Sequence, residues 1–565
     1  MERVLIIAAG LVLGLALMFS FVLDASLTPS EFLTQDRYVA VVLVAALLAS
    51  CRLPGIGRLP GCPPGWLPAI AVALGLALLL WLGTYRLMLD YPWTIDEVMA
   101  RFDARILTSG CLAQPVPPQW RPFVPGLSPY FLLDVPGHAA MVSSYMPVHA
   151  ALRALIGLVA DPALLNPLLA AGGFLLALHL AREEFADCAG AVWVVGAGYL
   201  LSTQIMAAAM SSYAMTGHLA LNLAWLACFR RQRWGSDLAA LAIGFLATGL
   251  HQIAFHPLFA APFLAEVLWH RQWRRVLTFA TGYMAILAFW VSYPHLVLLS
   301  QGLGAGAMGE GGGAAGFWSG RIAPLLFNRD PHTLALMDKN LLRFLCWNAG
   351  FMLPLMLLSW PAIRRGEGMA RPMAAGLALT IGLVAVVMPD QGHGWGYRYV
   401  HGVLGNALFL AGHGYRLAAR RDAVRADRMV IWPGLATLLL VMPFLLGAAH
   451  GFLVPAARLT ALIEAQRADV VILDTMRPSM AIKQVRNLPD LTNRPLVISS
   501  YHLQPGQAEE LCRRGSVVLI DRAAQQAVGF SPWLPRKSPE FEALVKPLAA
   551  RSCLRHPVPL RGVGG

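Results

Sequence analysis

The sequence predicts an all-α polytopic membrane protein with about thirteen transmembrane helices and a small C-terminal α/β domain. Of its 565 residues, 57% are hydrophobic and only 13% are charged, whereas a soluble domain carries about 25% charged residues. Apolar runs suited to crossing a bilayer recur from the N-terminus to about residue 451. Beyond about residue 455 the apolar runs become short and are bounded by polar residues, which is typical of a small extramembrane domain.

The apolar runs are the predicted transmembrane helices. We interpret the first as an uncleaved helix; a cleaved signal peptide is the alternative, although no A-x-A-like site follows it. Several runs are short for a span of about 20 residues, so one pair could form a re-entrant loop. The runs fall at about 4–24, 37–51, 66–89, 163–182, 189–209, 213–229, 237–250, 252–268, 276–299, 344–362, 372–389, 399–415 and 429–451.

Arginine residues are distributed among the loops in the pattern that orients membrane helices. With the N-terminus in the cytoplasm, every cytoplasmic loop is basic and the short outer loops are poor in Arg and Lys. The net charge of +13 therefore reflects topology, and we expect no nucleic-acid partner. The expected location is a bacterial inner membrane, with the C-terminal domain in the periplasm. The basic loops are 51–65, 181–188, 229–236, 270–275, 363–371 and 416–428.

Two long loops, 90–162 and 301–343, fall on the outer side. In the first, apolar residues over Thr94–Gly110 have the spacing of an amphipathic helix, which we expect to lie in the membrane interface. A short apolar helix over 150–160 is expected beside the membrane. The second loop is rich in glycine over 301–320 and lacks the Gly-Lys-Ser/Thr ending of a phosphate-binding loop. A flexible linker and a mobile lid over a cleft are both compatible with it.

The tail, residues 456–565, is expected to form the α/β domain. Short apolar runs at 468–474, 494–499 and 516–521 predict strands of a mainly parallel sheet. Cys512 and Cys553 are the only cysteines of this segment, and a disulfide in an oxidising periplasm and two free thiols are both left open. The eight cysteines of the chain show no CxxC pair and no Cys/His spacing that predicts zinc.

Two adjacent carboxylates, Asp96 and Glu97, lie about two helical turns beyond the apolar run 66–89. Alternatively, these two carboxylates only mark the end of a helix at the membrane interface. We select them as candidate catalytic residues, because a carboxylate kept at the edge of the bilayer usually has a function. Partial desolvation there would raise the pKa of one carboxylate, as a general base requires.

A second group of candidates occupies the segment 390–399, on another outer loop. Arg398 precedes a membrane helix on the outer side, so the orientation rule for basic loops does not explain it. With His393, Tyr397 and Tyr399 beside it, its guanidinium could bind the phosphate of a lipid in a bidentate manner. An aromatic and arginine anchor at the membrane interface is the alternative.

Further candidates for residues that line a cleft come from three other outer segments. They are polar or aromatic side chains close to predicted helix ends: Tyr145, His149, Tyr213, His218 and His256. A lone histidine near a helix end is often only structural. His251 lies at the tip that also holds His256, but no i, i+4 histidine pair with a carboxylate points to a metal site.

Together these residues resemble the GT-C superfamily of polyprenyl-phosphate-sugar-dependent glycosyltransferases. The likeness is greatest to the branch with protein O-mannosyltransferases and the aminoarabinose transferase of lipid A. Members carry an acidic residue, often Asp-Glu, in the first outer loop, as Asp96-Glu97 does here. Tyr145-Met-Pro-Val-His149-Ala is similar to part of their Tyr-Pro-Pro-x-His-Pro segment.

Two later segments add to the resemblance. Ser212-Tyr-Ala-Met-Thr-Gly-His218 is similar to a Ser-Tyr-Met-x-His stretch with altered spacing. Gly396-Tyr-Arg-Tyr399 matches a Gly-Pro-Arg-Tyr motif, with Tyr397 in place of proline. The usual Thr-Arg-Pro between the middle helices is absent, and His251–Pro257 takes its place.

The resemblance covers residues 66–455, which it makes the catalytic core, and leaves residues 1–65 as an additional helix pair. It implies an inverting transfer of a sugar from a polyprenyl-phosphate donor to a glycan, lipid or protein acceptor. Asp96 would deprotonate the acceptor hydroxyl, and Arg398 would stabilise the leaving phosphate, with His393 or a divalent cation beside it. No other cofactor is expected.

Two other classes of function fit the composition. A transporter or flippase of a lipid-linked saccharide is one, but such proteins tend to show inverted repeats and charges near the bilayer midplane. The sequence shows no repeat, and its acidic and basic candidates gather on one face. A membrane scaffold whose tail domain binds a partner is the other, and it leaves this one-sided cluster unexplained.

Overall fold

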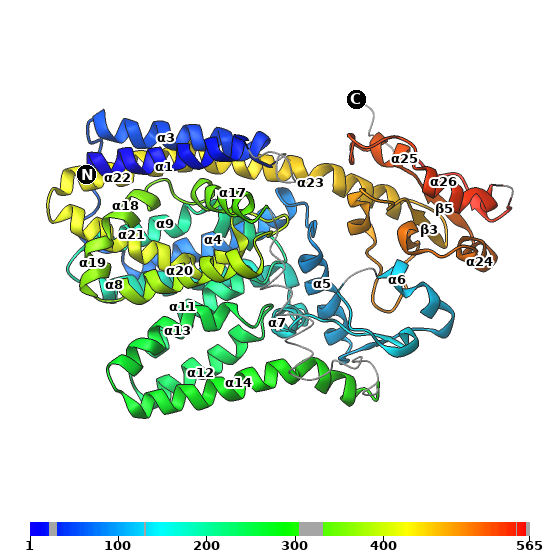
Figure 1. Ribbon diagram of the computed structural model, residues 1–565, viewed down its shortest axis with the longest axis horizontal. Coiled ribbons are helices and arrows are strands. Elements are labelled where there is room, and N and C mark those ends of the chain that lie inside the picture. Colours follow the sequence, from blue (N-terminus) through cyan, green and yellow to red (C-terminus); the bar gives the residue numbers. More distant parts are fainter. Residues whose placement is uncertain (22–30, 129–130, 304–331, 550, 561–565) are drawn as a thin grey trace.

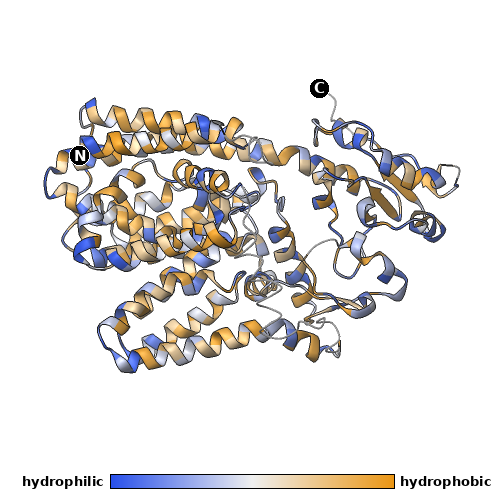
Figure 2. Ribbon diagram, in the orientation of Figure 1, coloured by the Kyte–Doolittle hydropathy of each residue, from blue (hydrophilic) through white to orange (hydrophobic). Residues whose placement is uncertain are grey.

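The computed structural model describes residues 1–21, 31–128, 131–303, 332–549 and 551–560. It is an elongated molecule with a helix bundle at one end and, at the other, a sheet domain packed beside the first outer loop (Figure 1). Hydrophobic residues run along the helices of the bundle, whereas hydrophilic residues gather in its end loops and in the sheet domain (Figure 2). The predicted fold class is confirmed.

Each of the thirteen predicted apolar runs coincides with one helix or with two or three consecutive helices. Among the described residues, seven helices are long and apolar enough to cross a membrane, or eight if the bent pair α9–α10 is counted as one span. The others are shorter. The helices are α1 (Glu2–Phe21), α3 (Arg37–Arg52), α4 (Trp66–Arg86), α8 (Leu165–Glu184), α9 (Ala189–Leu200), α10 (Thr203–Ala209), α11 (Met215–Phe229), α12 (Trp234–Thr248), α13 (Phe255–Trp269), α14 (Trp273–Ser300), α18 (Met352–Leu358), α19 (Trp360–Arg365), α20 (Ala370–Val387), α21 (Leu404–Ala419), α22 (Ala423–Ala436) and α23 (Met442–Glu464).

Small residues allow some of these helices to approach closely. Gly414 of α21 lies so near the backbone carbonyl of Leu355 in α18 that an added Cβ would overlap it. Such contacts are typical of membrane helices, which associate through close van der Waals contact because lipid tails are as apolar as the side chains.

The second long loop is only partly described. Most of its glycine-rich part, residues 304–331, lies outside the described residues, so the linker and the lid both stay predictions. The end of the loop forms α17 (Thr333–Cys346), which packs against α1 and α3.

A buried ion cluster connects the N-terminal helices to the loop that precedes Arg398. Arg343 of α17 lies at its centre, with Nη1 3.0 Å from a Glu31 oxygen and 3.1 Å from an Asp36 oxygen. Nη2 of the same guanidinium donates to the carbonyl of Gly394 at 2.9 Å. Because buried charges are stable only with partners, the cluster fixes this loop against the N-terminal pair. Its members are Glu31, Asp36, Lys339, Arg343 and His393.

Arg343→Met is expected to lower the free energy of unfolding by about 3–5 kcal/mol, since the buried carboxylates lose a cation that balances them. Thermal unfolding of the full-length protein in detergent measures this. The control is Arg365→Met: the Arg365 side chain is 60% exposed, and an exposed ion pair contributes less than about 1 kcal/mol. Equal melting temperatures for the two variants would contradict the role of the cluster.

The first outer loop contains a two-stranded antiparallel ribbon and several helices. The ribbon is β1 (Gln114–Pro115) with β2 (Ala140–Met141). The principal helices are α5 (Ile95–Thr108), α6 (Val124–Leu127) and α7 (Val148–Gly157). α5 and α7 pack on each other, through a small cluster that includes Ala104, Ala150 and Ala154.

The C-terminal domain holds a four-stranded sheet whose neighbouring strands are all parallel, in the order β4-β3-β5-β6. The first three strands in chain order match the three predicted runs. A disulfide joins Cys512 to Cys553, the pairing that the sequence left open. The elements are β3 (Val470–Leu473), β4 (Leu496–Ser499), α24 (Gln507–Arg514), β5 (Val517–Ile520), α25 (Arg522–Ala527), α26 (Pro539–Val545) and β6 (Leu554–Arg555).

The apolar face of α5 is covered by this domain. Met99, Phe102 and Ile106 share a buried core with Ile472 and Ile498 of the sheet. The expectation that this helix lies in the membrane interface is therefore wrong: its amphipathic pattern is correct, but its partner is a protein domain distant in the sequence.

Candidate active site

A capping box sets the start of α5 and separates the roles of Asp96 and Glu97. The Thr94 hydroxyl accepts from the Glu97 backbone N–H at 3.4 Å, and the Glu97 carboxylate accepts from the Thr94 N–H at 3.0 Å. The other Glu97 oxygen accepts from the backbone N–H of Ser212 at 3.4 Å. Glu97 is thus buried, and its carboxylate is used by the helix cap. Asp96 instead lines a small cavity together with Tyr145, His149 and His251.

Side chains from three distant segments meet at the Asp96 carboxylate. The Tyr145 hydroxyl donates to Oδ1 at 2.5 Å. A guanidinium nitrogen of Arg398 donates to Oδ2 and forms an ion pair with it. His251 Nε2 lies 3.9 Å from the same oxygen, and its ring stacks on Tyr145 with centroids 4.9 Å apart. The predicted acid and the predicted phosphate-binding arginine are therefore in direct contact.

The contacts of Asp96 favour its ionised form. Burial alone would raise its pKa, but the positive charge of Arg398, with His251 and the Tyr145 hydrogen bond, holds the pKa below its usual value. Burial and the charge of Asp96 raise the pKa of Tyr145 well above its ordinary value, so Tyr145 stays a hydrogen-bond donor. At neutral pH the site holds a carboxylate able to accept a proton.

Arg398 begins the short helix η7 (Arg398–Val403) and is surrounded by aromatic rings. Its Nη2 donates to the Tyr399 hydroxyl at 3.2 Å, and Nη1 lies 3.5 Å from the Tyr213 hydroxyl. Its backbone N–H donates to Gln391 at 2.9 Å. The Nε of Arg398 has no hydrogen-bond partner among the described residues. The Asp96 carboxylate and the two tyrosine hydroxyls therefore fix the position of the guanidinium.

The other predicted residues of this segment hold the loop and do not contact Asp96. His393 Nδ1 lies 2.5 Å from a Glu31 oxygen in the buried ion cluster, and its ring stacks on Phe452. Tyr397 is fully buried, and Gln204 binds both its backbone N–H and its carbonyl, at 3.1 and 2.8 Å. Both residues therefore position Arg398.

The predicted cleft residues divide into two groups. Tyr145 and His149 line the cavity at Asp96, and the Tyr213 hydroxyl contacts Arg398 and the His393 carbonyl. His218 and His256 lie in the helix core and do not line this cavity. In the described part of the chain, no group of three or more His, Cys, Asp or Glu side chains could hold a metal ion.

The C-terminal domain contributes a cation that the sequence analysis missed. Lys483 of η9 (Met480–Gln484) places Nζ 4.4 Å from the ring centroid of Trp93, three residues before Asp96. Within the described ranges, no carboxylate lies within ion-pair distance of the Lys483 ammonium group. Burial, followed by repulsion from Arg398, lowers the pKa of Lys483 to about 8. In the sequence, only the aromatic residues before α5 indicated that another segment packs on them. No pattern identified that segment as the one with Lys483.

Neighbouring contacts hold this cation in place. Arg486 lies 4.0 Å above the Tyr91 ring and donates to the Pro92 carbonyl at 2.8 Å. Gln484 donates to the Tyr91 hydroxyl at 2.5 Å. The C-terminal domain is therefore attached to the segment that leads directly into the active-site helix.

The sequence matches no protein-family model and no curated protein. Among solved structures, the chain is similar to ArnT from Cupriavidus metallidurans bound to undecaprenyl phosphate: the TM-score is 0.52 and the identity 14%, over 77% of this chain and 86% of that chain. The apo state of the same ArnT gives a TM-score of 0.49 and 13% identity, over 86% and 89%. The predicted resemblance is confirmed at the level of the fold, because this chain has the architecture of ArnT.

Proposed function

We propose that the protein is an integral membrane glycosyltransferase of the bacterial inner membrane. It transfers a sugar from a polyprenyl-phosphate-linked donor to an extracytoplasmic acceptor. The observation that carries the proposal is the ion pair of Asp96 with Arg398, a proton acceptor and a phosphate-binding group brought together from positions about three hundred residues apart. The undecaprenyl phosphate bound by the similarly folded ArnT supports the nature of the donor.

The expected reaction is an inverting displacement at the anomeric carbon. The acceptor oxygen forms a bond to this carbon while its proton passes to the Asp96 carboxylate. The bond from the anomeric carbon to the phosphate oxygen breaks, and its electron pair leaves with the polyprenyl phosphate. Arg398 stabilises the charge that develops on the phosphate.

The ion pair also couples donor binding to the strength of the base. Without donor, Arg398 holds the pKa of Asp96 low, which makes Asp96 ionised but a weak base. A donor phosphate that attracts the guanidinium would weaken the lowering of the Asp96 pKa by Arg398. Burial would then raise this pKa. Asp96 would then become a stronger base only after the donor is in place.

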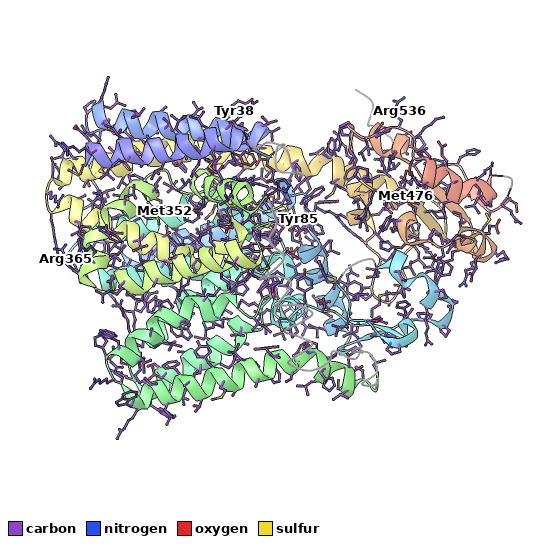
Figure 3. All side chains as sticks on the ribbon, viewed as in Figure 1. Tyr38, Tyr85, Met352, Arg365, Met476 and Arg536 are labelled. Carbon is purple, nitrogen blue, oxygen red and sulfur yellow. A yellow bond between two sulfur atoms is a disulfide. The ribbon has the colours of Figure 1, made fainter. Side chains whose placement is uncertain are left out.

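The arrangement of charged loops supports an active site on the periplasmic side. Arg365, in one of the basic loops, lies at the end of the bundle farthest from the C-terminal domain, which holds Met476 (Figure 3). Basic loops orient towards the cytoplasm. The opposite end, with α5 and the C-terminal domain, would then face the periplasm.

Lys483 is expected to bind the donor phosphate together with Arg398, since the pair with Asp96 partly neutralises Arg398. Lys483→Gln should weaken donor binding about tenfold to a hundredfold, the effect of losing one hydrogen bond to a charged group. Equilibrium binding of a labelled polyprenyl-phosphate sugar measures this, with the exposed Lys537→Gln as the control. Equal donor affinity of Lys483→Gln and the wild type would contradict the assignment.

The pH dependence of donor binding tests the same residue independently. The pKa of Lys483 is lowered to about 8, so the cation is present below pH 8 and is lost as the pH rises through that value. Donor affinity of the wild type should therefore fall above pH 8, and bound phosphate will shift the midpoint upward. Lys483→Arg keeps its charge throughout and should show no such fall. A parallel decline in both proteins would refute the role of Lys483.

Turnover of a panel of radiolabelled polyprenyl-phosphate sugars by the purified full-length protein tests the proposed function. Release of labelled sugar, or its transfer to a co-purified acceptor, is the expected result. Binding of a donor without any turnover would instead favour transport of a lipid-linked saccharide.

A further inference from the structure

The small cavity at Asp96 is lined by two buried acceptor atoms that lack partners. His149 Nε2 lies 3.0 Å from the Ser212 carbonyl, which can only accept, so Nε2 carries the ring proton and Nδ1 is an acceptor. This Nδ1 has no hydrogen-bond partner among the described residues, and neither has Oδ1 of Asp103, a second carboxylate of the cavity wall. A buried acceptor without a donor costs free energy, so both atoms call for one.

Asp103 lies two helical turns beyond Asp96 on the same face of α5. The i, i+7 spacing separates the two Cα atoms by about 10 Å along the helix axis, and both carboxylates line the cavity. The cavity has room for about one or two water molecules. A water molecule supplies two O–H donors, which suits the unpartnered atoms of His149 and Asp103.

A second small cavity adjoins the first and shares Asp103 and Tyr145 with it. It too has room for about one or two water molecules. Its wall includes the Ser143 hydroxyl and Leu112, which is 42% exposed, so this cavity reaches the surface. Asp103 therefore stands between the cavity at Asp96 and a cavity that leads outward.

Asp103 is also the lining group best suited to carry a proton. Burial raises the pKa of Asp103 to about 7, although the Ser143 hydroxyl opposes this shift, so Asp103 both binds and releases a proton near neutral pH. Burial lowers the pKa of His149 to about 3, so its ring stays neutral. Among the described residues, neither cavity is lined by Lys or Arg, and the remaining titratable groups of the two walls are Asp96, Tyr145, His251 and Tyr293.

We propose that the two cavities hold water and that Asp103 is the group through which the proton taken up by Asp96 leaves the active site. This inference rests on the proposed function. The O–H bond of protonated Asp96 breaks, its proton passes to the water of the first cavity, and this water gives one of its own protons to Asp103. Asp96 is then a carboxylate again, Asp103 is a carboxylic acid, and the water is unchanged. Asp103 finally releases its proton to the water of the second cavity and so to solvent.

The ion pair of Asp96 with Arg398 drives this transfer. While the polyprenyl phosphate attracts the guanidinium, Asp96 keeps the proton that it took from the acceptor. When the polyprenyl phosphate leaves, Arg398 pairs with Asp96 again and lowers its pKa below the usual value, whereas the pKa of Asp103 is about 7. The proton therefore moves to Asp103 after the chemical step, and this transfer restores the base for the next turnover.

Infrared difference spectroscopy of the full-length protein in nanodiscs tests the hydrated carboxyl group without any substrate. The wild type should show the C=O band of a carboxylic acid that shifts in D2O and disappears as the pH rises through about 7. Asp103→Asn should lack this band. Asp134→Asn should keep it, because Asp134 is an exposed acid of the same outer loop. Identical spectra for the wild type and Asp103→Asn, or a band that does not shift in D2O, would overturn the proposal.

Turnover kinetics at pH 8, where Asp103 is mainly ionised, test the proton transfer itself. Asp103→Asn should complete its first turnover at a rate close to that of the wild type, because its Asp96 starts as a carboxylate. Its steady-state rate should fall about a hundredfold, the lower end of what a positioned acid–base group contributes. Formate should restore the steady-state rate of Asp103→Ala by replacing the missing carboxylate, and should leave Asp134→Asn unchanged. Melting temperatures check that each variant is folded.

The outcomes separate this inference from the proposed function. Equal steady-state rates for Asp103→Asn and the wild type would refute the proton transfer and leave the function standing. A first turnover slowed as much as the steady state, or no rescue of Asp103→Ala by formate, would show that Asp103 is only structural. A wild type that turns over no donor would refute the function, and the proton transfer with it, because Asp96 then receives no proton.

Discussion

Asp96→Asn is expected to lower the rate of sugar transfer by about 10³–10⁴-fold while the protein still inserts and folds. The substitution preserves the shape of the side chain but removes the proton acceptor, and general-base catalysis contributes up to about this factor. It also removes the negative partner of Arg398. Donor affinity should therefore stay the same or increase, which separates a catalytic defect from a binding defect. Single-turnover kinetics at saturating donor and acceptor measure the chemical step.

Glu97→Gln is the matched control, because it changes the neighbouring carboxylate in the same helical turn. Glutamine also serves at the third position of a capping box, so α5 should keep its start. Transfer by this variant should stay within about tenfold of the wild type, in contrast to the general-base effect above. A larger loss with Glu97→Gln than with Asp96→Asn would assign the base to Glu97 and contradict our interpretation of the cap.

Arg398→Ala has the second largest expected effect. The variant loses a group that stabilises the leaving phosphate, which should lower kcat by about 10²–10³-fold. The KM for the donor should rise by about tenfold to a hundredfold. Donor-titration kinetics measure both quantities. Arg420→Ala is the control, since Arg420 is an exposed residue that pairs with Asp187 in the basic loops.

The same variant should change the pH dependence of the reaction. In the wild type, Arg398 holds the pKa of Asp96 below its usual value, so Asp96 is ionised through the weakly acid range. Without the guanidinium, burial dominates and the pKa of Asp96 rises. Activity of Arg398→Ala should therefore be lost at a higher pH than that of the wild type as the pH falls. An unchanged acid limb would show that Arg398 does not act on Asp96.

Patterns that arise from local structure were predictable from the sequence. The apolar runs gave the helices because every bilayer-spanning backbone must satisfy its own hydrogen bonds. The three short runs of the tail gave β3, β4 and β5. The alternation of basic loops also indicated that Asp96 and Arg398 share one side of the membrane, which made their contact foreseeable.

Contacts between distant segments were not predictable in this way. Nothing in the sequence around Lys483 indicates that it lies above Trp93, about 390 residues earlier. The partner of the apolar face of α5 was misjudged for the same reason, since an amphipathic pattern does not state what covers it. Glu31 and Arg343, whose charges meet in the buried ion cluster, likewise belong to segments that no local pattern relates.

The direction in which each side chain points could not be predicted from the sequence, and this limited the prediction of the site residues. Asp96 and Glu97 are adjacent in the sequence, yet the capping box turns one into the helix cap and leaves the other on the cavity wall. Only the fold shows which of these two carboxylates lines the cavity.

The most direct test of the central claim is transfer of radiolabelled sugar from polyprenyl-phosphate donors by purified wild type and Asp96→Asn, measured side by side. The account predicts turnover of at least one donor by the wild type and binding without turnover by Asp96→Asn. Equal turnover by both proteins would remove Asp96 as the base and contradict the mechanism. If both proteins bind a donor and neither turns it over, the proposed glycosyltransferase activity itself would be contradicted.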